Sequence, residues 1–421
     1  MSNARPRLCM VTIGCKANQC DSAAMLGYLA EKYEIVGAGP DAAAEVYVIN
    51  TCTVTHKADF DARQWVRRIR RRNPAAKIIA TGCMAETGRE SLAREKVDAI
   101  FGVSERERLV EELTGQRPGA GPGIFHHPSA GLQLRGRAML KIQEGCDHRC
   151  SYCIVPYARG RSRSMEPSRV LQQLSSLAGQ GFEEVVLCGI NLAEWGRDIG
   201  AELADLIKEI EREKFPARIR LSSLEPMGIT EKLVNAIASS QIVCPHLHLP
   251  LQSGDDQLLK RMKRPYSAQK ILELCGRLLA EIPGLCLGLD VITGFPGEGP
   301  AQFENTISLL EKIPFGYLHV FTFSPRAGTP GQKLEPRVPE RVSRERARRL
   351  ARLSRRRRRE FAASQLGQTM EMVVEGREGD WSYGHSGNYL YLKVRTESPV
   401  RKRIRVQLKI ADKELIAEEI A

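Results

Sequence analysis

The chain has 421 residues, a mass of 46.9 kDa and a formal net charge of +13. Hydrophobic residues make up 42% of the sequence and charged residues 27%, a composition typical of folded globular proteins that excludes a disordered or fibrous chain. The length predicts about two to four domains. The sequence has no apolar run of about eighteen residues and no signal-peptide pattern at its start, so we expect a cytoplasmic protein that does not enter a membrane.

The sequence contains twelve cysteines, a number that needs a chemical reason in the cytoplasm. Disulfide bonds are rare in that compartment, so metal binding or redox chemistry is favoured. The positive charge favours a polyanionic partner. Residues 337–360 hold twelve arginines and three glutamates, a run that is either a solvated helix face or a contact for nucleic acid.

The first third of the chain alternates short apolar strands with helices. Strands are predicted at residues 8–13, 46–50 and 77–81, and helices at 22–32 and 59–72. This order predicts a parallel α/β domain, in which chemistry gathers at the carboxyl ends of the strands. A cysteine follows each strand: Cys15, Cys52 and Cys83. Because neighbouring strands lie close together, the three thiols converge on one site in one interpretation; in the other they are unrelated buried groups.

A Gly/Pro-rich segment at 115–123 predicts a domain boundary, after which strands and helices alternate again. Six strands are expected there, which favours an incomplete parallel barrel. Three short strands and a Gly/Ser-rich turn at 382–388 then indicate a small β-barrel. The expected domains are 1–117, 132–360 and 361–421. The expected strands are 138–142, 184–188, 218–221, 246–249, 285–292 and 317–323, then 369–375, 389–394 and 401–410.

Cys146, Cys150 and Cys153 form a C-x3-C-x2-C motif just after the first strand of the expected barrel. Thiolates suit iron–sulfur clusters or zinc. Three ligands leave one iron of a four-iron cluster open, whereas structural zinc needs a fourth Cys or His. His148 lies inside the loop, an awkward place for a fourth ligand, so we favour the cluster.

This motif, with Tyr152 before its last cysteine, resembles the radical S-adenosylmethionine (SAM) superfamily. Other segments resemble the methylthiotransferase family, and the C-terminal strands resemble that family's TRAM domain. The segments are Gly14–Gln19, Asn50–Thr55, Thr81–Ala85, Leu221–Pro226, Pro250–Gly254, Asp290–Glu298 and Phe323–Pro330. The resemblance therefore covers nearly the whole chain.

The resemblance implies an enzyme that uses SAM and two [4Fe–4S] clusters. One cluster cleaves SAM to a radical that removes hydrogen from an unactivated carbon, which general-base chemistry cannot deprotonate. The other delivers the sulfur of a methylthio group. The radical-forming cluster would be held by Cys146, Cys150 and Cys153, and the sulfur-delivering cluster by Cys15, Cys52 and Cys83.

Nine residues are candidates for SAM contact because they match family positions or follow expected barrel strands. They are Tyr152, Gly189, Ser222, Ser223, Glu225, Gln252, Gly294, Phe295 and Arg326. Loop packing, turns and capping are the structural alternatives. Arg326 is expected to pair with one of two carboxylates, that of SAM or that of the substrate. His246 and His248 alternate on one strand and are expected to form a hydrogen-bonded barrel interior.

Members of this family act on adenosines beside the tRNA anticodon or on a ribosomal protein. The arginine-rich helix favours tRNA, because arginines bind phosphates and unpaired loop bases can enter a pocket. Gly14–Gln19 and His246–Gln252 resemble the branch that modifies N6-threonylcarbamoyladenosine at position 37. Cys20–Ser22 and Asn191 depart from that branch, and Asn191 resembles the branch that modifies N6-isopentenyladenosine.

We therefore predict a monomeric tRNA methylthiotransferase that binds the anticodon loop and takes electrons from a donor such as flavodoxin or ferredoxin. The alternative from another class is a non-catalytic iron–sulfur protein that binds RNA. The aromatic residues of the C-terminal domain either stack bases or pack its core. They are Trp381, Tyr383, Tyr389 and Tyr391.

Overall fold

The computed structural model describes residues 5–37, 42–117, 136–411 and 414–420. The predicted boundary at 115–123 therefore lies largely outside the described residues. Within the described ranges, no helix combines the length and the apolar character needed to cross a membrane.

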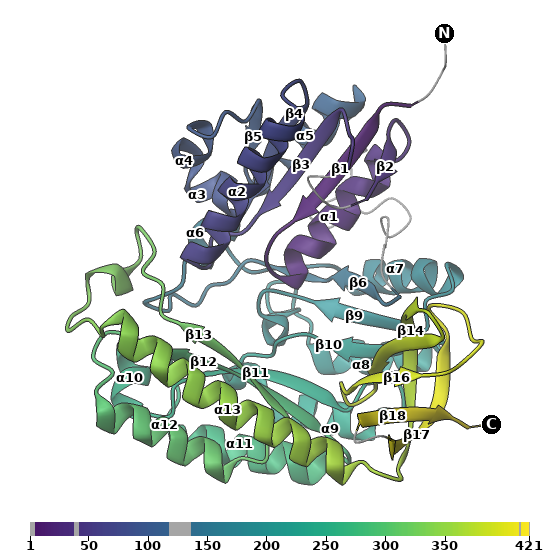
Figure 1. Ribbon diagram of the computed structural model, residues 1–421. Coiled ribbons are helices and arrows are strands. Elements are labelled where there is room, and N and C mark those ends of the chain that lie inside the picture. The colour runs from purple at the N-terminus through teal and green to yellow at the C-terminus, as the bar shows by residue number, and fades with distance from the viewer. Residues whose placement is uncertain (1–4, 38–41, 118–135, 412–413, 421) are drawn as a thin grey trace.

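The first domain is a five-stranded parallel sheet with helices on both faces (Figure 1). Its elements are β1 (Arg7–Thr12), α1 (Lys16–Leu29), β2 (Glu34–Val36), β3 (Val46–Thr51), α2 (His56–Arg72), β4 (Lys77–Gly82), α3 (Cys83–Thr87), α4 (Arg89–Ala93), β5 (Ala99–Phe101) and α5 (Arg106–Thr114). The strand order is β2-β1-β3-β4-β5. Helices α1 and α5 pack on one face and α2 on the other, which is why β3 is buried along its whole length.

The predicted start of the first helix was wrong: α1 begins at Lys16, not at residue 22. The first turns of α1 carry polar side chains, and a polar stretch of this kind is typical of a loop. In the structure Asn18, Asp21 and Ser22 are buried because α1 packs against β6 of the barrel as well as on its own sheet.

The second domain is the predicted incomplete parallel barrel, and all six expected strands are present. Its elements are β6 (Ala138–Lys141), β7 (Gln143–Glu144), α6 (Val155–Arg159), β8 (Arg163–Ser164), α7 (Pro167–Gly179), β9 (Glu184–Cys188), α8 (Leu203–Arg212), β10 (Arg218–Leu221), α9 (Glu231–Ser239), β11 (His246–Gln252), α10 (Asp256–Arg261), α11 (Ala268–Glu281), β12 (Cys286–Thr293), α12 (Pro300–Lys312), β13 (Tyr317–Thr322) and α13 (Glu340–Ser364). Two three-stranded parallel sheets, β10-β9-β6 and β11-β12-β13, are joined by bridges between Ile219 and Val243 and between Ser223 and His248. Among the described residues β6 and β13 do not pair, so the barrel stays open between them.

Side chains alternate between the two faces of the barrel wall. Leu247 and Leu249 of β11 pack into the large apolar core beneath the outer helices. His246 and His248, which lie between them in the sequence, therefore face the interior.

The C-terminal domain is a closed five-stranded barrel, as expected from its short strands. Its strands are β14 (Thr369–Glu378), β15 (Trp381–Ser386), β16 (Tyr391–Val394), β17 (Arg403–Ala411) and β18 (Glu414–Glu419), in the order β14-β15-β16-β18-β17. The predicted turn at 382–388 was wrong, because most of it is strand β15. Gly384 is there for close packing: an added Cβ would lie 1.8 Å from the backbone oxygen of Val373 on β14.

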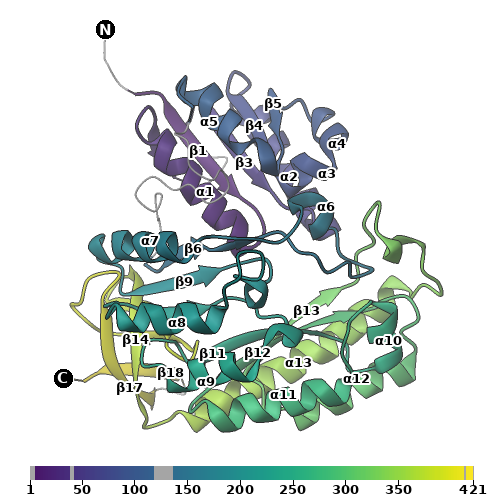
Figure 2. The same cartoon turned by 180° about the vertical axis from the view of Figure 1, so that it is seen from behind.

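Figures 1 and 2 show the first domain on one side of the parallel barrel and the closed barrel at one end of it. The closed barrel docks where β9, β10 and β11 begin. Arg218 and Arg220 of β10 donate hydrogen bonds to backbone carbonyls of residues 371 and 385–387. Tyr389 stacks on His246 with ring centroids 4.1 Å apart. The closed barrel therefore covers the amino ends of the parallel strands, and the first domain lies at their carboxyl ends.

Candidate functional site

Cys15, Cys52 and Cys83 lie at the carboxyl ends of three neighbouring strands of the first sheet. Cys15 is the residue before α1, Cys52 follows β3 and Cys83 begins α3 directly after β4. Burial raises the pKa of Cys52 to about 12, and repulsion from the neighbouring Cys15 and Cys83 thiolates adds to the rise. Gly14 permits the close approach: its φ is +108°, and an added Cβ would lie 2.9 Å from Cys52 Sγ. The structure thus brings these three thiols together.

Cys146, Cys150 and Cys153 lie on the loop between β7 and α6. The Cys153 N–H donates to the Cys150 carbonyl at 3.1 Å, and the Cys146 N–H to that of Gly160 at 3.1 Å, which folds the loop back on itself. Burial raises the pKa of Cys146 to about 11 and that of Cys153 to about 12. Arg264 donates to Cys150 Sγ at 3.3 Å. Its guanidinium offsets the charge that a thiolate ligand carries.

The spacing of the sulfurs separates zinc from a larger group. Three thiolates on one zinc ion lie about 3.8 Å apart, because each Zn–S bond is about 2.3 Å long in a tetrahedron. In neither trio, all six cysteines being described, do the three sulfurs lie within 4.8 Å of one another. A four-iron cluster takes one sulfur on each of three irons and holds them further apart. Both donor sets therefore fit iron–sulfur clusters.

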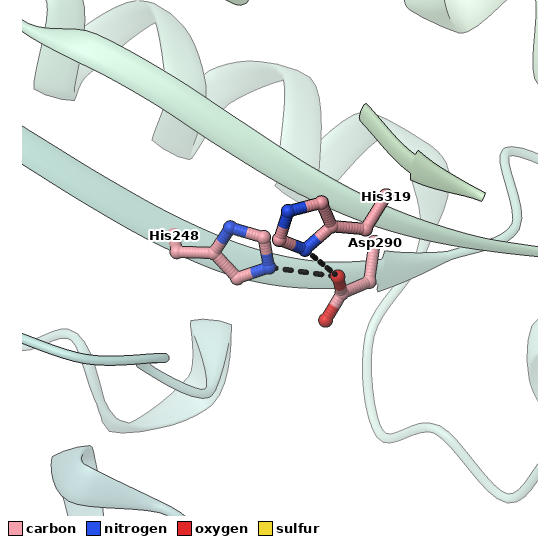
Figure 3. A group of neighbouring side chains, drawn as sticks. All are labelled: His248, Asp290 and His319. Atoms are coloured by element: carbon pink, nitrogen blue, oxygen red, sulfur yellow. Dashed lines mark hydrogen bonds and ion pairs between the residues drawn. The ribbon is translucent and has the colours of Figure 1, made fainter. Parts of the chain in front are cut away.

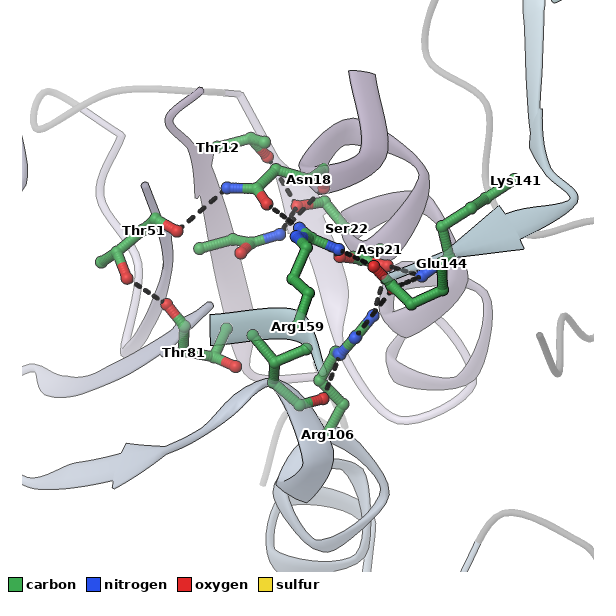
Figure 4. Close-up of polar contacts among 12 residues, drawn as sticks. Thr12, Asn18, Asp21, Ser22, Thr51, Thr81, Arg106, Lys141, Glu144 and Arg159 are labelled. Atoms are coloured by element: carbon green, nitrogen blue, oxygen red, sulfur yellow. Dashed lines mark hydrogen bonds and ion pairs between the residues drawn. The ribbon is translucent and has the colours of Figure 1, made fainter. Parts of the chain in front are cut away.

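A buried ion network lies where α6, the helix after the loop of Cys146, Cys150 and Cys153, meets the first domain (Figure 4). Arg159, at the end of α6, donates to Glu144 at 2.6 Å and to Asp21 at 3.1 Å. It also hydrogen-bonds the Cys83 thiol. Lys141 and Arg106 pair with the same two acids. These contacts fix α6, which follows Cys146, Cys150 and Cys153, against the first domain. They do so at the end of the sheet that carries Cys15, Cys52 and Cys83.

Opposite charges keep this network ionised although it is buried. Burial alone would raise the pKa of Glu144, but Lys141, Arg159 and Arg106 hold it well below its usual range. The same cations lower the pKa of Asp21 against its burial. Sliding of one domain over the other would leave these charges unpaired, so the network favours a single orientation.

Several of the predicted SAM contacts meet at the carboxyl ends of the barrel strands. Ser222 Oγ accepts a hydrogen bond from the Gly189 N–H at 3.2 Å. Glu225 pairs with Arg264, the residue that contacts Cys150. Gln252 ends β11 with φ +67°, a conformation that side-chain-bearing residues rarely adopt and that often marks functional sites.

The remaining predicted contacts have structural partners. Phe295 is fully buried and meets Tyr152 edge to face, with ring centroids 6.4 Å apart. Gly294 packs so closely on α13 that an added Cβ would lie 1.9 Å from Ser343 Oγ. Ser223 bridges to His248 through the backbone.

Arg326 contacts the first domain. It donates to Thr53 at 2.7 Å and also pairs with Asp59, both close in sequence to Cys52. This ion pair already offsets its charge, and its binding of a SAM or substrate carboxylate stays a prediction.

Sequence reasoning anticipated a polar barrel interior but missed three of its members, Asp290, His319 and Tyr317. Figure 3 shows Asp290 and His319 beside His248. Asp290 on β12 accepts from His248 Nε2 at 2.7 Å and pairs with His319 Nδ1 on β13 at 3.3 Å. Burial opposes the charge, yet these hydrogen bonds lower the pKa of Asp290 to about 2. The Tyr317 hydroxyl joins His246 and His248 at 2.9 and 3.0 Å. Only the alternation of β11 signalled this network in the sequence.

The two positions that depart from the threonylcarbamoyladenosine branch, Cys20 and Asn191, are both buried. Cys20 hydrogen-bonds Cys188 of β9 and lies in an apolar cluster between the domains, which explains its burial. Asn191 is 4% exposed, and both polar atoms of its side chain lack a hydrogen-bond partner among the described residues. Such an amide is costly to bury unless a ligand satisfies it.

An incomplete parallel barrel of six strands that carries a three-cysteine loop at the carboxyl ends of its strands defines a radical SAM protein. Residues 140–310 match the profile described as the radical SAM superfamily, and residues 7–102 match the profile described as uncharacterized protein family UPF0004. The threonylcarbamoyladenosine tRNA methylthiotransferase MtaB of Bacillus subtilis is 35% identical over 94% of this chain and 92% of its own length. The chain therefore belongs to the methylthiotransferase family of radical SAM enzymes.

Two further comparisons concern a relative with another substrate name and a solved structure with a similar fold. A tRNA-2-methylthio-N(6)-dimethylallyladenosine synthase of Pelotomaculum thermopropionicum is 33% identical over 88% of this chain and 86% of its own. Among solved structures, the radical SAM methyltransferase TsrM of Kitasatospora setae, with cobalamin and a [4Fe–4S] cluster bound, matches with a TM-score of 0.57 at 16% identity, over 78% of this chain and 77% of that one. The last similarity concerns the fold alone.

Proposed function

We propose that this protein adds a methylthio group to C2 of N6-threonylcarbamoyladenosine at position 37 of tRNA. The observation that carries the proposal is the pair of cysteine trios at the carboxyl ends of parallel strands in two domains that the Arg159 network holds together. Related proteins with both substrate names share about a third of the sequence over most of the chain, which supports the tRNA methylthiotransferase class.

Cys146, Cys150 and Cys153 would hold the cluster that binds SAM, and Cys15, Cys52 and Cys83 the second cluster. When bound, these groups supply a hydrogen-abstracting radical and the transferred sulfur. Arg264 offsets thiolate charge at Cys150, and Glu225 keeps Arg264 in place. The first domain covers this end of the barrel, and its buried contacts exclude water from a reaction that water would quench.

The barrel interior supports the threonylcarbamoyl substituent over a purely apolar one. That group carries a carboxylate, a hydroxyl and a urea, which need polar partners. His248, Asp290 and His319 present such partners on adjacent strands. Asn191 supports the alternative, N6-isopentenyladenosine, only through its resemblance to that branch.

Nucleoside analysis of tRNA from cells that lack the gene tests the substrate. Loss of the methylthio group from threonylcarbamoyladenosine supports the proposal, and loss from isopentenyladenosine moves the function to the sister branch. Re-expression of the protein with Cys15→Ala is expected to leave the unthiolated nucleoside in place. A strain without any change in methylthio nucleosides would favour the non-catalytic RNA-binding alternative.

Iron analysis tests the cofactors separately. The wild-type protein is expected to hold about eight irons, and about four after all cysteines of either trio are changed to alanine. If replacement of Cys15, Cys52 and Cys83 leaves the iron content unchanged, those three thiols bind no cluster. A cytoplasmic, monomeric enzyme with flavodoxin or ferredoxin as electron donor completes the proposal.

A further inference from the structure

The arginines of α13 fall into two groups that the sequence alone does not separate. One group pairs with glutamates: Arg349 with Glu304 at 2.9 Å and Arg356 with Glu311 at 2.7 Å, both acids lying on α12. Arg344 pairs with Glu340 at 2.5 Å. The other group is exposed, and its side chains have no ion pair or hydrogen bond within the part of the chain that the structure describes. One of its members, Arg358, lies over the ring of Tyr317 and on another side of the helix. The rest are Arg341, Arg348, Arg352, Arg355 and Arg359, here named the arginine stripe.

The arginine stripe lies on one face of the helix. At 100° per residue its members fall within a sector of about 60°, and at 1.5 Å per residue they span about 27 Å. The buried residues of α13, Leu350 and Leu353 among them, lie on the opposite side. The stripe therefore points straight away from the core. One acid, Glu345, borders it near its first arginine.

An ordinary solvated helix face mixes charges of both signs and gains from pairs three or four residues apart. Here Arg348, Arg352 and Arg355 follow one another at such spacings and repel. The chain does supply acids where α13 meets α12, so the missing partners on the stripe are a local feature. Arginine forks also match phosphate oxygens two at a time, which favours RNA backbone as the partner.

The ends of α13 place the stripe on a route across the molecule. Near its start, the Ser343 carbonyl accepts from Thr293 Oγ1 at 3.2 Å, and Thr293 ends β12 at the mouth of the barrel. Just after its end, Gln365 accepts from Asn388 of the closed barrel at 2.9 Å. Figure 1 shows α13 running between these two regions. The stripe thus connects the proposed reaction site with the C-terminal domain.

We propose that the arginine stripe binds the sugar–phosphate backbone of the tRNA stem that adjoins the anticodon loop while that loop occupies the barrel mouth. This inference rests on the proposed function, because it takes tRNA as the substrate. It assigns the backbone contact to the radical SAM domain, along one helix face, in addition to any contact made by the closed barrel.

Two matched triple variants test it on the cluster-loaded enzyme. Arg348, Arg352 and Arg355 are changed to glutamine in the stripe variant, and the paired residues Arg344, Arg349 and Arg356 in the control. Both variants lower the formal charge by three. Binding of unmodified tRNA is measured by fluorescence anisotropy from low to moderate salt.

The stripe variant is expected to bind about tenfold more weakly at 0.1 M salt, and the slope of log affinity against log salt to fall by roughly 2 to 3, because each phosphate contact contributes about 0.7 to 0.9. The control should keep the wild-type slope. Equal slopes for the two variants would show that only net charge matters and would overturn the proposal.

Further arms separate the remaining outcomes. Lysine at the same three stripe positions keeps the charge and should restore most of the slope, whereas a loss as large as with glutamine would indicate damage to the helix and count against the proposal. Unchanged tRNA binding with lost binding to phosphatidylserine vesicles would assign the stripe to a lipid surface and overturn it. Failure of the wild-type enzyme to bind any tRNA would instead refute the proposed function.

Discussion

Glu184 holds the closed barrel to the parallel barrel, and its replacement by glutamine is the sharpest stability test that the structure offers. The carboxylate is fully buried at the start of β9 and accepts from Arg218 at 2.6 Å, Arg220 at 2.7 Å and Arg137 at 3.3 Å. Burial would raise its pKa, but these guanidiniums hold the pKa below its usual range. Two of them also donate to carbonyls of the closed barrel.

Glu184→Gln keeps the shape but leaves Arg218 and Arg220 without their counter-charge, whereas Arg137 keeps its ion pair with Glu375 at 2.9 Å. Removing one partner of a buried ion pair costs about 3 to 5 kcal/mol, and the retained amide oxygen places the expected loss near the lower end. Glu183→Gln is the matched control, because Glu183 pairs with Lys402 of the same closed barrel at 2.8 Å while the two side chains stay 28% and 54% exposed. Such a pair contributes about 1 kcal/mol at most.

The free energy of unfolding is measured by urea titration, and hydrogen exchange at residues 385–389 reports on the docking loop. Glu184→Gln should lower the former by about 3 kcal/mol and speed exchange in the loop, while Glu183→Gln changes both little. If the two variants are equally stable, the docking does not depend on the buried charge cluster and the reasoning is refuted.

Three further changes probe the contact with the first domain and the interior of the barrel. Arg159→Met should lower the free energy of unfolding by about 3 kcal/mol in urea, whereas Arg163→Met, an exposed neighbour, should change it by less than about 0.5 kcal/mol. Gly288→Ala should cost about 1 to 3 kcal/mol in a thermal melt, since an added Cβ would lie 2.3 Å from a neighbouring tyrosine ring, while Gly276→Ala in open surroundings should stabilise its helix. The pKa of Asp290 is lowered to about 2, so its ionised form contributes about 2 kcal/mol above pH 4 that is lost as the pH falls toward 2. Asp290→Asn should remove that part of the acid dependence, and an unchanged acid profile would contradict it.

The sequence predicted the strands that are buried on both faces, because short apolar runs bounded by polar loops leave few alternatives. It missed β2 and β5, which are only three residues long, and β18. Composition misled at β15, where Gly384 serves the close approach of two strands and not a turn. It also misled at α1, whose polar first turns become buried only when the barrel packs against them.

Topology allowed the convergence of Cys15, Cys52 and Cys83 as one of two interpretations, because parallel strands end at one edge of a sheet, and the resemblance favoured it. The other trio was predicted from its C-x3-C-x2-C spacing. The contacts of Arg159, Arg326 and Asp290 were not, since each depends on how separately folded units or distant strands come together. Arg326 shows the difference: its sequence position follows the last barrel strand, yet its ion pair is with Asp59 of the first domain. Motif reasoning places such a residue near the site but cannot tell which neighbour takes its charge.

Buried ion clusters lie at both ends of the parallel barrel, and together they set the geometry that a tRNA would meet. The Arg159 network fixes the first domain over the carboxyl ends of the strands, and the Glu184 cluster fixes the closed barrel at the amino ends. Apolar contacts alone tolerate sliding, whereas a shift of either cluster would expose a charge to a dry interface. The separation between the cysteine trios and the closed barrel is therefore fixed, and α13 spans it. A substrate held along α13 would then present its loop at one depth only, which allows a single nucleotide to be selected by position and not by its neighbours.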